Sequence, residues 1–327
     1  MQTFESFGGD LYPPNDAVFD EIALRLFQYQ AEHNPVYRRY LACLGVVPTD
    51  IAHVRDIPFL PISLFKTQDI RTGNWSPELT FMSSGTTGQS VSRHSIPSRV
   101  HYLQHSQKIF ESFYGPLRDF HVLCLLPSYL ERTGSSLVLM ADHFIRESAS
   151  DESGFFLHDL ARLAERLVSL RGSRRVLLLG VTFALLDLAE DYPMDLSHCV
   201  VMETGGMKGR RPEITREELH EVLKKSFNLP NVHSEYGMTE LLSQAYSPGE
   251  GIFRCPASMR VLLKEVNDPF SAKYITSGLI NVVDLANAHS CAFIETQDLG
   301  RSREGGYFEV LGRMDASDAR GCNLMVE

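Results

Sequence analysis

The chain has 327 residues, of which 43% are hydrophobic and 10% aromatic, so it can bury a substantial core and is not expected to be disordered. Its 41 acidic residues outnumber the 31 basic ones and give a formal net charge of −10. This balance argues against nucleic acid as a partner, because nucleic-acid-binding domains usually carry a basic footprint.

The cysteines and the N-terminus indicate a protein of the cytoplasm. Six cysteines are scattered along the chain without a C-x-x-C pair, a pattern that favours free thiols over a disulfide framework. The first residues lack the basic and apolar regions of a signal peptide. The most apolar stretch, residues 176–186, is too short to span a bilayer, so we expect no membrane span.

The N-terminal part of the chain is predicted to be helical. Residues 16–32 place apolar side chains on one helical face, with Asn15 as a suitable cap. The residues of this face are Phe19, Ile22, Ala23, Leu26 and Phe27. A second helix is expected over residues 36–44. Residues 57–62 are apolar but hold two prolines, which predicts an irregular or edge segment.

Strand and helix patterns then alternate between residues 120 and 235. Short apolar runs are predicted to be strands at 121–126, 175–179 and 199–202. Helical patterns cover 155–170, 182–191 and 215–227. This order predicts an α/β fold with a mostly parallel sheet and helices on its faces. After residue 258, strands are expected at 259–266, 278–285, 291–296 and 307–311 without helices between them, which indicates a β-rich part.

The segment Ser83-Ser84-Gly85-Thr86-Thr87-Gly88 is the strongest local candidate for a phosphate-binding loop. Its two glycines permit a tight turn with exposed backbone N–H groups, and four hydroxyls add donors. It is not a Walker A loop, because no lysine follows in the required position. An ordinary polar turn remains an equally good interpretation of these six residues alone.

Three further candidates follow predicted strands. Residues 235–240 (EYGMTE) combine an aromatic ring, a hydroxyl and a carboxylate, which could stack on a base, touch a phosphate and hold Mg²⁺. Residues 203–206 (ETGG) end another strand, where open α/β sheets bind ligands. Residues 298–300 (DLG) are followed by 312–315 (GRMD). Each of these segments alone could be a plain turn.

The order SSGTTG, TGG, YGMTE, QDLG and GRMD resembles the adenylate-forming superfamily of acyl-CoA synthetases, adenylation domains and luciferases. The resemblance implies ATP and Mg²⁺ as cofactors. It also implies roles for individual residues: Ser83, Ser84, Gly85, Thr86, Thr87 and Gly88 form the phosphate loop, Gly205 and Gly206 flank the adenine, Tyr236 stacks on it, Thr239 meets the α-phosphate, Glu240 binds Mg²⁺, Asp298 holds the ribose hydroxyls and Arg313 contacts the ribose.

The sequence departs from the superfamily pattern in two ways, and the second, the short C-terminal part, points to a narrower branch. The lysine that usually ends the phosphate loop is replaced, with Arg93 the nearest cation, and only 12 residues follow Asp315, so the C-terminal lid domain is expected to be missing. Residues 57–66 (IPFLPISLFK) and 127–130 (PSYL) resemble the acyl-protein synthetase family, whose best-known members are the luminescence-related fatty-acid ligases. Those enzymes pass the acyl group to a cysteine near their C-terminus, which implies this role for Cys322.

The expected organisation is an adenylation domain over residues 1–312, with a helical region at 1–56 and a β-rich part at 258–312, followed by a hinge remnant and tail at 313–327. The expected activity is ATP-dependent conversion of a carboxylic acid, expected to be a fatty acid, into acyl-AMP. Transfer to Cys322 would then deliver the acyl group to a partner such as a reductase or another acceptor protein.

Two alternatives stay open. The acceptor could be coenzyme A or a carrier-protein thiol, as in phenylacetate–CoA ligases. The chain could instead be a nucleotide- or acyl-binding subunit without turnover. His101 and His105 have the spacing of a metal pair, but no H-E-x-x-H pattern accompanies them, which favours an ordinary surface or core pair.

Overall fold

The computed structural model describes residues 11–83, 91–126, 134–157, 159–172, 174–205, 214–268 and 275–314. The chain divides into two units, one made of Met1–Gly73 with Ala257–Glu327 and the other of Asn74–Pro256. Ser84–Gly88, Gly206 and Cys322 lie outside the described residues. The expected boundary at residue 312 stays a prediction, because the tail from residue 315 is not described either.

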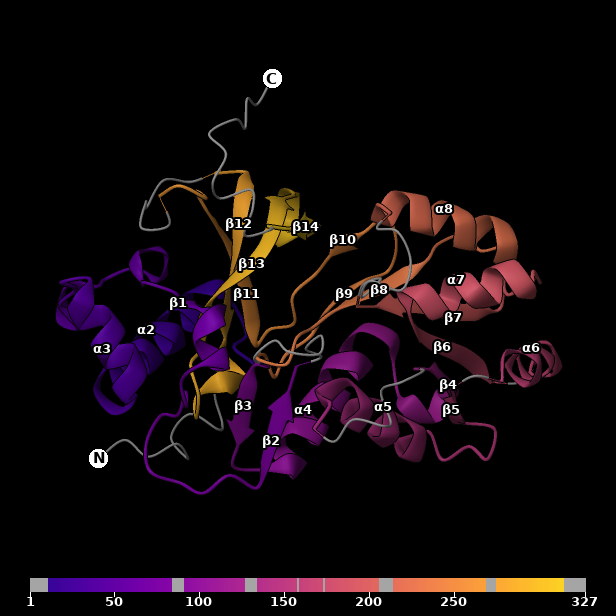
Figure 1. The fold of residues 1–327 in the computed structure, drawn as a ribbon, viewed down its shortest axis with the longest axis horizontal. Coiled ribbons are helices and arrows are strands. Elements are labelled where there is room, and N and C mark those ends of the chain that lie inside the picture. The colour runs from indigo at the N-terminus through magenta and orange to yellow at the C-terminus, as the bar shows by residue number, and fades with distance from the viewer. Residues whose placement is uncertain are drawn as a thin grey trace. The chain divides into compact units, whose positions relative to one another are not determined.

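The first unit combines two helices with an antiparallel sheet (Figure 1). The helices are α2 (Asp16–His33) and α3 (Pro35–Cys43). The strands are β1 (Leu60–Pro61), β11 (Met259–Lys264), β12 (Ser277–Asp284), β13 (Phe293–Ser302) and β14 (Phe308–Arg313). Strands β11 to β14 pair in chain order as an antiparallel meander, and β1 pairs in parallel with β13.

Helix α2 confirms the predicted amphipathic face and its cap. The side chain of Asn15 accepts a hydrogen bond from the backbone N–H of Val18, and the predicted apolar positions are all buried. Phe27 packs edge-on against Phe293 of β13, with ring centroids 5.9 Å apart. Buried Gln30 donates to the carbonyl of Asn287 and accepts from the N–H of Ala292, so it satisfies backbone groups of the turn between β12 and β13.

Close backbone packing explains a glycine in the β12 strand. A β-carbon on Gly278 would overlap the carbonyl oxygen of Lys264 on β11, which is backbone and cannot rotate away. We expect Gly278→Ala to lower the free energy of unfolding by about 2 kcal/mol, in the range of overpacked interiors. Urea denaturation followed by circular dichroism measures this change. Gly154→Ala is the matched control, because nothing lies within 4 Å of its added methyl group; equal midpoints for the two variants would contradict the prediction.

The second unit is built on a mostly parallel sheet with the strand order β5-β4-β6-β7-β8-β9 and a separate hairpin. The strands of the sheet are β4 (Phe120–Leu125), β5 (Gly154–Phe156), β6 (Arg175–Val181), β7 (Cys199–Thr204), β8 (His233–Tyr236) and β9 (Ala245–Ser247). The hairpin consists of β2 (Leu79–Met82) and β3 (Arg93–Ile96), and β10 (Ile252–Phe253) follows β9. The helices are α4 (Arg99–Tyr114), α5 (Ser136–Glu147), α6 (Leu160–Ser169), α7 (Thr182–Asp191) and α8 (Arg216–Phe227).

The connections of this sheet decide which face each helix covers. Strands β6, β7 and β8 follow one another in space as in sequence, so right-handed crossovers place α7 and α8 on the same face. The step from β4 to β5 runs in the opposite direction and places α5 on the other face, beside α4 (Figure 1). The predicted α/β architecture with helices on both faces is therefore confirmed.

One local prediction needs correction, and another is confirmed. The helix expected over residues 155–170 begins only at Leu160, because Gly154–Phe156 forms the edge strand β5 beside β4. The five cysteines within the described residues are free thiols, as predicted, and Cys43 is exposed. It lies in the last turn of α3, whose buried residues are Tyr37 and Leu41.

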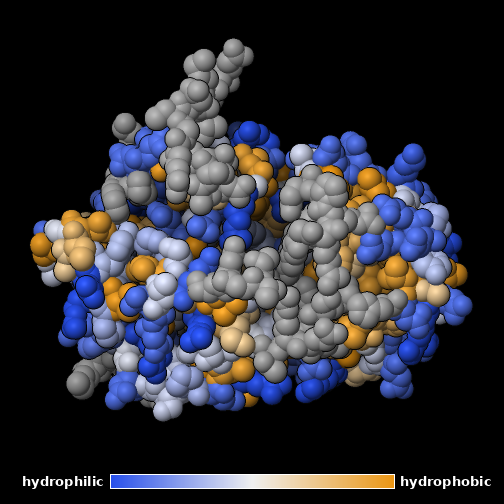
Figure 2. Space-filling model, in the orientation of Figure 1, coloured by the Kyte–Doolittle hydropathy of each residue, from blue (hydrophilic) through white to orange (hydrophobic). Residues whose placement is uncertain are grey.

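The most exposed large hydrophobic residues in the described part of the chain lie in different places along it. They are Val47, Val100, Val168 and Leu311. On the face visible in Figure 2, hydrophobic groups are separated by hydrophilic ones. None of the helices in the described ranges is both long and apolar enough to cross a membrane.

Candidate active site

The carboxyl ends of three parallel strands bring the described parts of the ETGG and EYGMTE segments to one edge of the sheet. Val181 of β6 is in register with Thr204 of β7, and Thr204 is in register with Glu235 of β8. Thr182, which follows β6, donates its hydroxyl to the carbonyl of Gly205 at 3.1 Å. Open α/β sheets bind ligands at this edge, so ETGG and EYGMTE stand where the sequence analysis expects a site.

The phosphate-loop candidate begins on the hairpin of the same unit. Ser83 extends the pairing of β2 and β3: its N–H donates to the carbonyl of Ser92, and its hydroxyl accepts from the N–H of Ser92 at 2.9 Å. Ser83 is the one member of the predicted loop that lies among the described residues.

His94 of β3 connects this hairpin to the turn that carries Thr239. Its Nδ1 lies 2.9 Å from the carbonyl oxygen of Thr239. The carbonyl can only accept, so Nδ1 carries the ring proton. Burial lowers the pKa of His94 to about 4, and the hydrogen bond to Thr239 opposes this shift only in part. The ring is therefore neutral at pH 7 and acts as a fixed donor to the turn.

Two of the predicted side chains on this turn are buried. Tyr236 is 7% exposed and packs edge-on against Phe253 at 5.9 Å, so only a small part of its ring could meet a base. Glu240 is 5% exposed. A carboxylate in such a position interacts strongly with a cation, because little solvent screens it.

A buried charge network lies beneath the turn and has no counterpart in the sequence prediction. Oε1 of Glu203 is 3.1 Å from Nε of Arg216 and 3.7 Å from Nε2 of His220, both on α8. Burial raises the pKa of Glu203, but the hydrogen bond from His220 and the charge of Arg216 outweigh it and hold the pKa below its usual value. Glu203 is therefore a buried carboxylate, and the positive charge of Arg216 on helix α8 balances its negative charge.

The predicted ribose-binding residues belong to the first unit, where they face each other across two strands. Asp298 of β13 is in register with Arg313 of β14, and Nε of Arg313 lies 3.8 Å from Oδ1 of Asp298. The N–H of Asp298 donates to the hydroxyl of Thr296, which in turn donates to the carbonyl of Ile280. This chain of bonds fixes Asp298, whereas the Arg313 side chain is 67% exposed.

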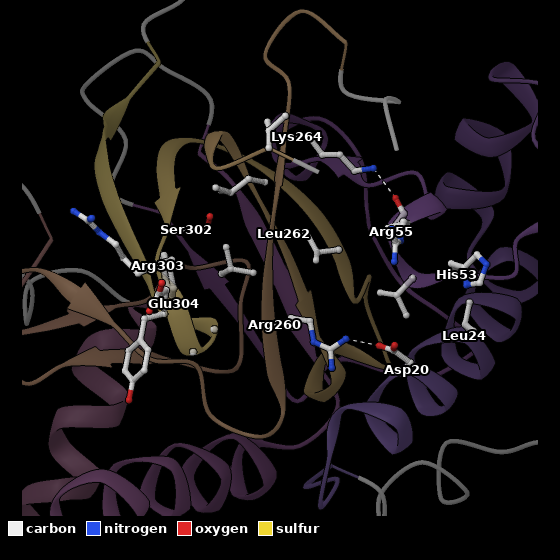
Figure 3. Close-up of a pocket in the computed structure, with 18 of the residues that line it drawn as sticks. Asp20, Leu24, His53, Arg55, Arg260, Leu262, Lys264, Ser302, Arg303 and Glu304 are labelled. Carbon is white, nitrogen blue, oxygen red and sulfur yellow. Dashed lines mark hydrogen bonds and ion pairs between the residues drawn. The ribbon is translucent and has the colours of Figure 1, made fainter. Parts of the chain in front are cut away.

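The first unit also holds a pocket of about 550 Å³, lined by α2, β11 and the connection between β13 and β14 (Figure 3). Its size is that of a small-molecule site. However, Arg260 is paired with Asp16 and Asp20, and Lys264 donates to the carbonyl of Arg55. None of the site residues predicted from the sequence motifs lines this pocket. The motif residues are therefore the better candidates for the site.

The spacing of His101 and His105 reflects packing in the core and not a metal site. The rings of His101 and His105 are stacked with centroids 6.1 Å apart, and Nε2 of His105 lies 2.9 Å from the hydroxyl of Ser243. Burial lowers the pKa of His105 to about 3, so this ring is a neutral member of the core. No group of three or more potential metal ligands occurs within the described ranges. Mg²⁺ can still be held at such a site by one carboxylate, because substrate phosphates supply further ligands.

Comparisons with known proteins identify the fold. No protein-family profile and no curated protein sequence matches the chain. Among solved structures, 2-hydroxyisobutyryl-CoA ligase in complex with 2-HIB-AMP and CoA is 16% identical, with a TM-score of 0.64 over 94% of this chain and 78% of the ligase. The same ligase in its postadenylation state with 2-HIB-AMP gives 14% identity and a TM-score of 0.65 over 96% of this chain and 69% of the ligase.

ATP-bound MatB from Rhodopseudomonas palustris is 16% identical, with a TM-score of 0.53 over 72% of this chain. The match covers 47% of MatB, so this chain spans about half the length of that protein. The fold expected from the motif order is thus shared with these ligases over most of the chain. At this level of identity the likeness describes the fold alone.

Proposed function

We propose that this chain activates a carboxylic acid with ATP to give acyl-AMP and pyrophosphate. The observation that carries the proposal is the EYGMTE turn at the carboxyl end of β8, linked by His94 to the hairpin that begins the Ser83 loop. In the proposed reaction the acid's carboxylate attacks the α-phosphorus of ATP, and the bond to pyrophosphate breaks. The shared fold supports this proposal, since the neighbours include structures bound to ATP and to an acyl-AMP.

The residues of the site would contribute charge stabilisation and orientation. Thr239 would donate its hydroxyl to the α-phosphate. The hydroxyl of Ser83, with the N–H groups and hydroxyls of residues 84–88, would hold the other phosphate oxygens. Glu240 would hold Mg²⁺, which when bound neutralises charge on the phosphates. Asp298 and Arg313 would bind the ribose. Because burial keeps His94 neutral, it would orient the Thr239 carbonyl without adding charge beside the phosphates.

The second half of the proposal is acyl transfer to Cys322 of the same chain. The thiolate of Cys322 would attack the acyl carbon of acyl-AMP, a thioester would form and AMP would leave. Such a thioester could then be consumed by a partner enzyme, for example a reductase. The proposed acid is a fatty acid, on the strength of the resemblance to the acyl-protein synthetases.

One experiment tests both steps. The protein is incubated with ATP, Mg²⁺ and a panel of carboxylic acids, while pyrophosphate release and the intact protein mass are recorded. We expect pyrophosphate with at least one acid and a mass increase of one acyl group in place of one hydrogen. Cys322→Ser should abolish the mass increase and leave a single round of adenylate formation intact, whereas Cys43→Ser, at an exposed thiol, should change neither.

Transfer to coenzyme A is the second candidate, and the solved neighbours favour it. The 2-hydroxyisobutyryl-CoA ligase structure is a complex with both 2-HIB-AMP and CoA. Under this reading the wild type forms acyl-AMP without a mass increase on the protein, and added coenzyme A restores turnover. Nucleotide binding without pyrophosphate release for any acid would contradict both readings and leave a binding subunit.

A further inference from the structure

Glu235 is a buried acidic residue that precedes the predicted site residues Tyr236, Thr239 and Glu240. It is 8% exposed and lies at the end of β8, in register with Thr204 at the end of β7. One of its carboxylate oxygens, Oε2, accepts a hydrogen bond from the hydroxyl of Thr204. This bond joins the two strand ends by their side chains, just before the backbone turns into the candidate site.

The second carboxylate oxygen of Glu235, Oε1, lies against Gly237 in the turn. A β-carbon on Gly237 would overlap Oε1 of Glu235 and would lie 3.4 Å from Cγ of Gln244. The α-carbon of Gly237 is therefore in close contact with the carboxyl group, and no other residue type fits this position without displacing it. The constraint at Gly237 is one of space and not of backbone conformation: its φ angle is not in the left-handed region, and an added side chain would have to displace the Glu235 carboxyl.

The surroundings of Glu235 favour its protonated form. Burial raises the pKa of Glu235 to about 7, the hydrogen bond from Thr204 opposes this shift, and the nearby charge of Glu203 adds to it. The phenols of Tyr102 on α4 and Tyr246 on β9 also face this group, and its charge raises their pKa values further. A neutral carboxyl can keep the bond from Thr204 without bringing a second negative charge beside Glu203.

We infer that Glu235 is a positioning residue: by binding Thr204 and covering Gly237, its side chain fixes the turn that carries Thr239 and Glu240. The structural part of this inference stands on its own, whereas its effect on catalysis rests on the proposed function. Small displacements of catalytic groups are costly, so loss of this clamp is expected to lower kcat for adenylate formation 10- to 100-fold. The KM for ATP should change by less than about threefold, because the other phosphate and ribose contacts remain.

Hydrogen exchange in the full-length protein tests the structural part. Glu235→Ala and Thr204→Val should raise the exchange rate of amides in residues 237–241 at least about tenfold, while amides of α2 and β12 keep their wild-type rates. Glu235→Gln should remain close to wild type, because its amide oxygen can still accept from Thr204. Unchanged exchange in the turn, or an equal increase throughout the chain, would overturn the inference.

A second pair of variants tests the contact with Gly237. Gly237→Ala should raise exchange in the turn, and the same change in a Glu235→Ala background should add little, because the carboxyl it displaces is gone. Additive effects would show that the two residues do not interact. Pyrophosphate assays on the same samples separate a failure of the proposed function from a failure of the structural role inferred for Glu235. A wild type that releases none defeats the proposed function, whereas the exchange rates still decide whether Glu235 holds the turn.

Discussion

Replacing Glu240 by glutamine should lower the rate of pyrophosphate release about 100-fold, the usual cost of losing one electrostatic contact to a reacting phosphate or oxyanion. The substitution keeps the size of the side chain and removes its negative charge. Glu240 is 5% exposed, so solvent cannot replace the missing charge when the phosphates and their cation bind. Initial rates at saturating ATP, with Mg²⁺ varied, measure the effect, which higher Mg²⁺ should reduce only in part.

The matched control is Glu221→Gln on the exposed side of α8, which removes the same charge from the same unit. It should change the rate less than twofold, because an exposed charge is screened by water and salt. Equal rates for Glu240→Gln and the wild type would contradict the role proposed for Glu240. Equal losses in both variants would mean that the rate follows net charge and not this position.

The sequence predicts those elements whose pattern is local. Residues 16–33 show a single apolar stripe with a capping Asn15, and the buried strands β4, β6 and β7 are continuous apolar runs bounded by polar residues. Residues 136–147 were not predicted, because Leu137-Val138-Leu139-Met140 is an unbroken apolar run that fits a buried strand as well as helix α5. The strand β5 has three residues and exists only because it pairs with β4.

The candidate site is predictable only as far as its motifs are contiguous. EYGMTE and ETGG stand at strand ends, as expected from the alternation of strands and helices. The bond from His94 to Thr239 joins residues 145 positions apart, and no local pattern marks it. Glu235 begins the EYGMTE segment, but the sequence assigns it no role. Only the structure shows that its carboxyl is buried between Thr204 and Gly237. The burial of this carboxyl results from contacts with residues far away in the sequence, which form only when the sheet is packed.

Removal of the Arg216 charge should strongly destabilise the second unit. Arg216 lies 3.1 Å from Oε1 of Glu203, which is 3% exposed, and its guanidinium also packs 5.1 Å from the ring centre of Phe253. Arg216→Met keeps the aliphatic stem and leaves the carboxylate buried with His220 and the hydroxyl of Ser234 as its remaining partners. Breaking a buried ion pair on one side typically costs 3–5 kcal/mol, so we expect a loss of about 3 kcal/mol in unfolding free energy at pH 8.

The pH dependence of this loss identifies its cause. In the wild type the pKa of Glu203 is held below its usual value, so its contribution to stability is present above that value and disappears as the pH falls through the folded pKa. In Arg216→Met the buried carboxyl can avoid the penalty by taking up a proton. The difference between variant and wild type should therefore shrink as the pH falls from 8 to 5, measured by urea denaturation at each pH.

Arg146→Met is the matched control, because it removes an exposed ion pair with Asp142 in which the arginine side chain is 66% exposed. It should cost less than about 1 kcal/mol at any pH in this range, as surface pairs usually do. A loss in Arg216→Met that is constant between pH 5 and pH 8 would instead assign the effect to the packing against Phe253. A loss that shrinks as the pH falls therefore assigns the stability contributed by Arg216 to its charge, and a constant loss assigns it to packing.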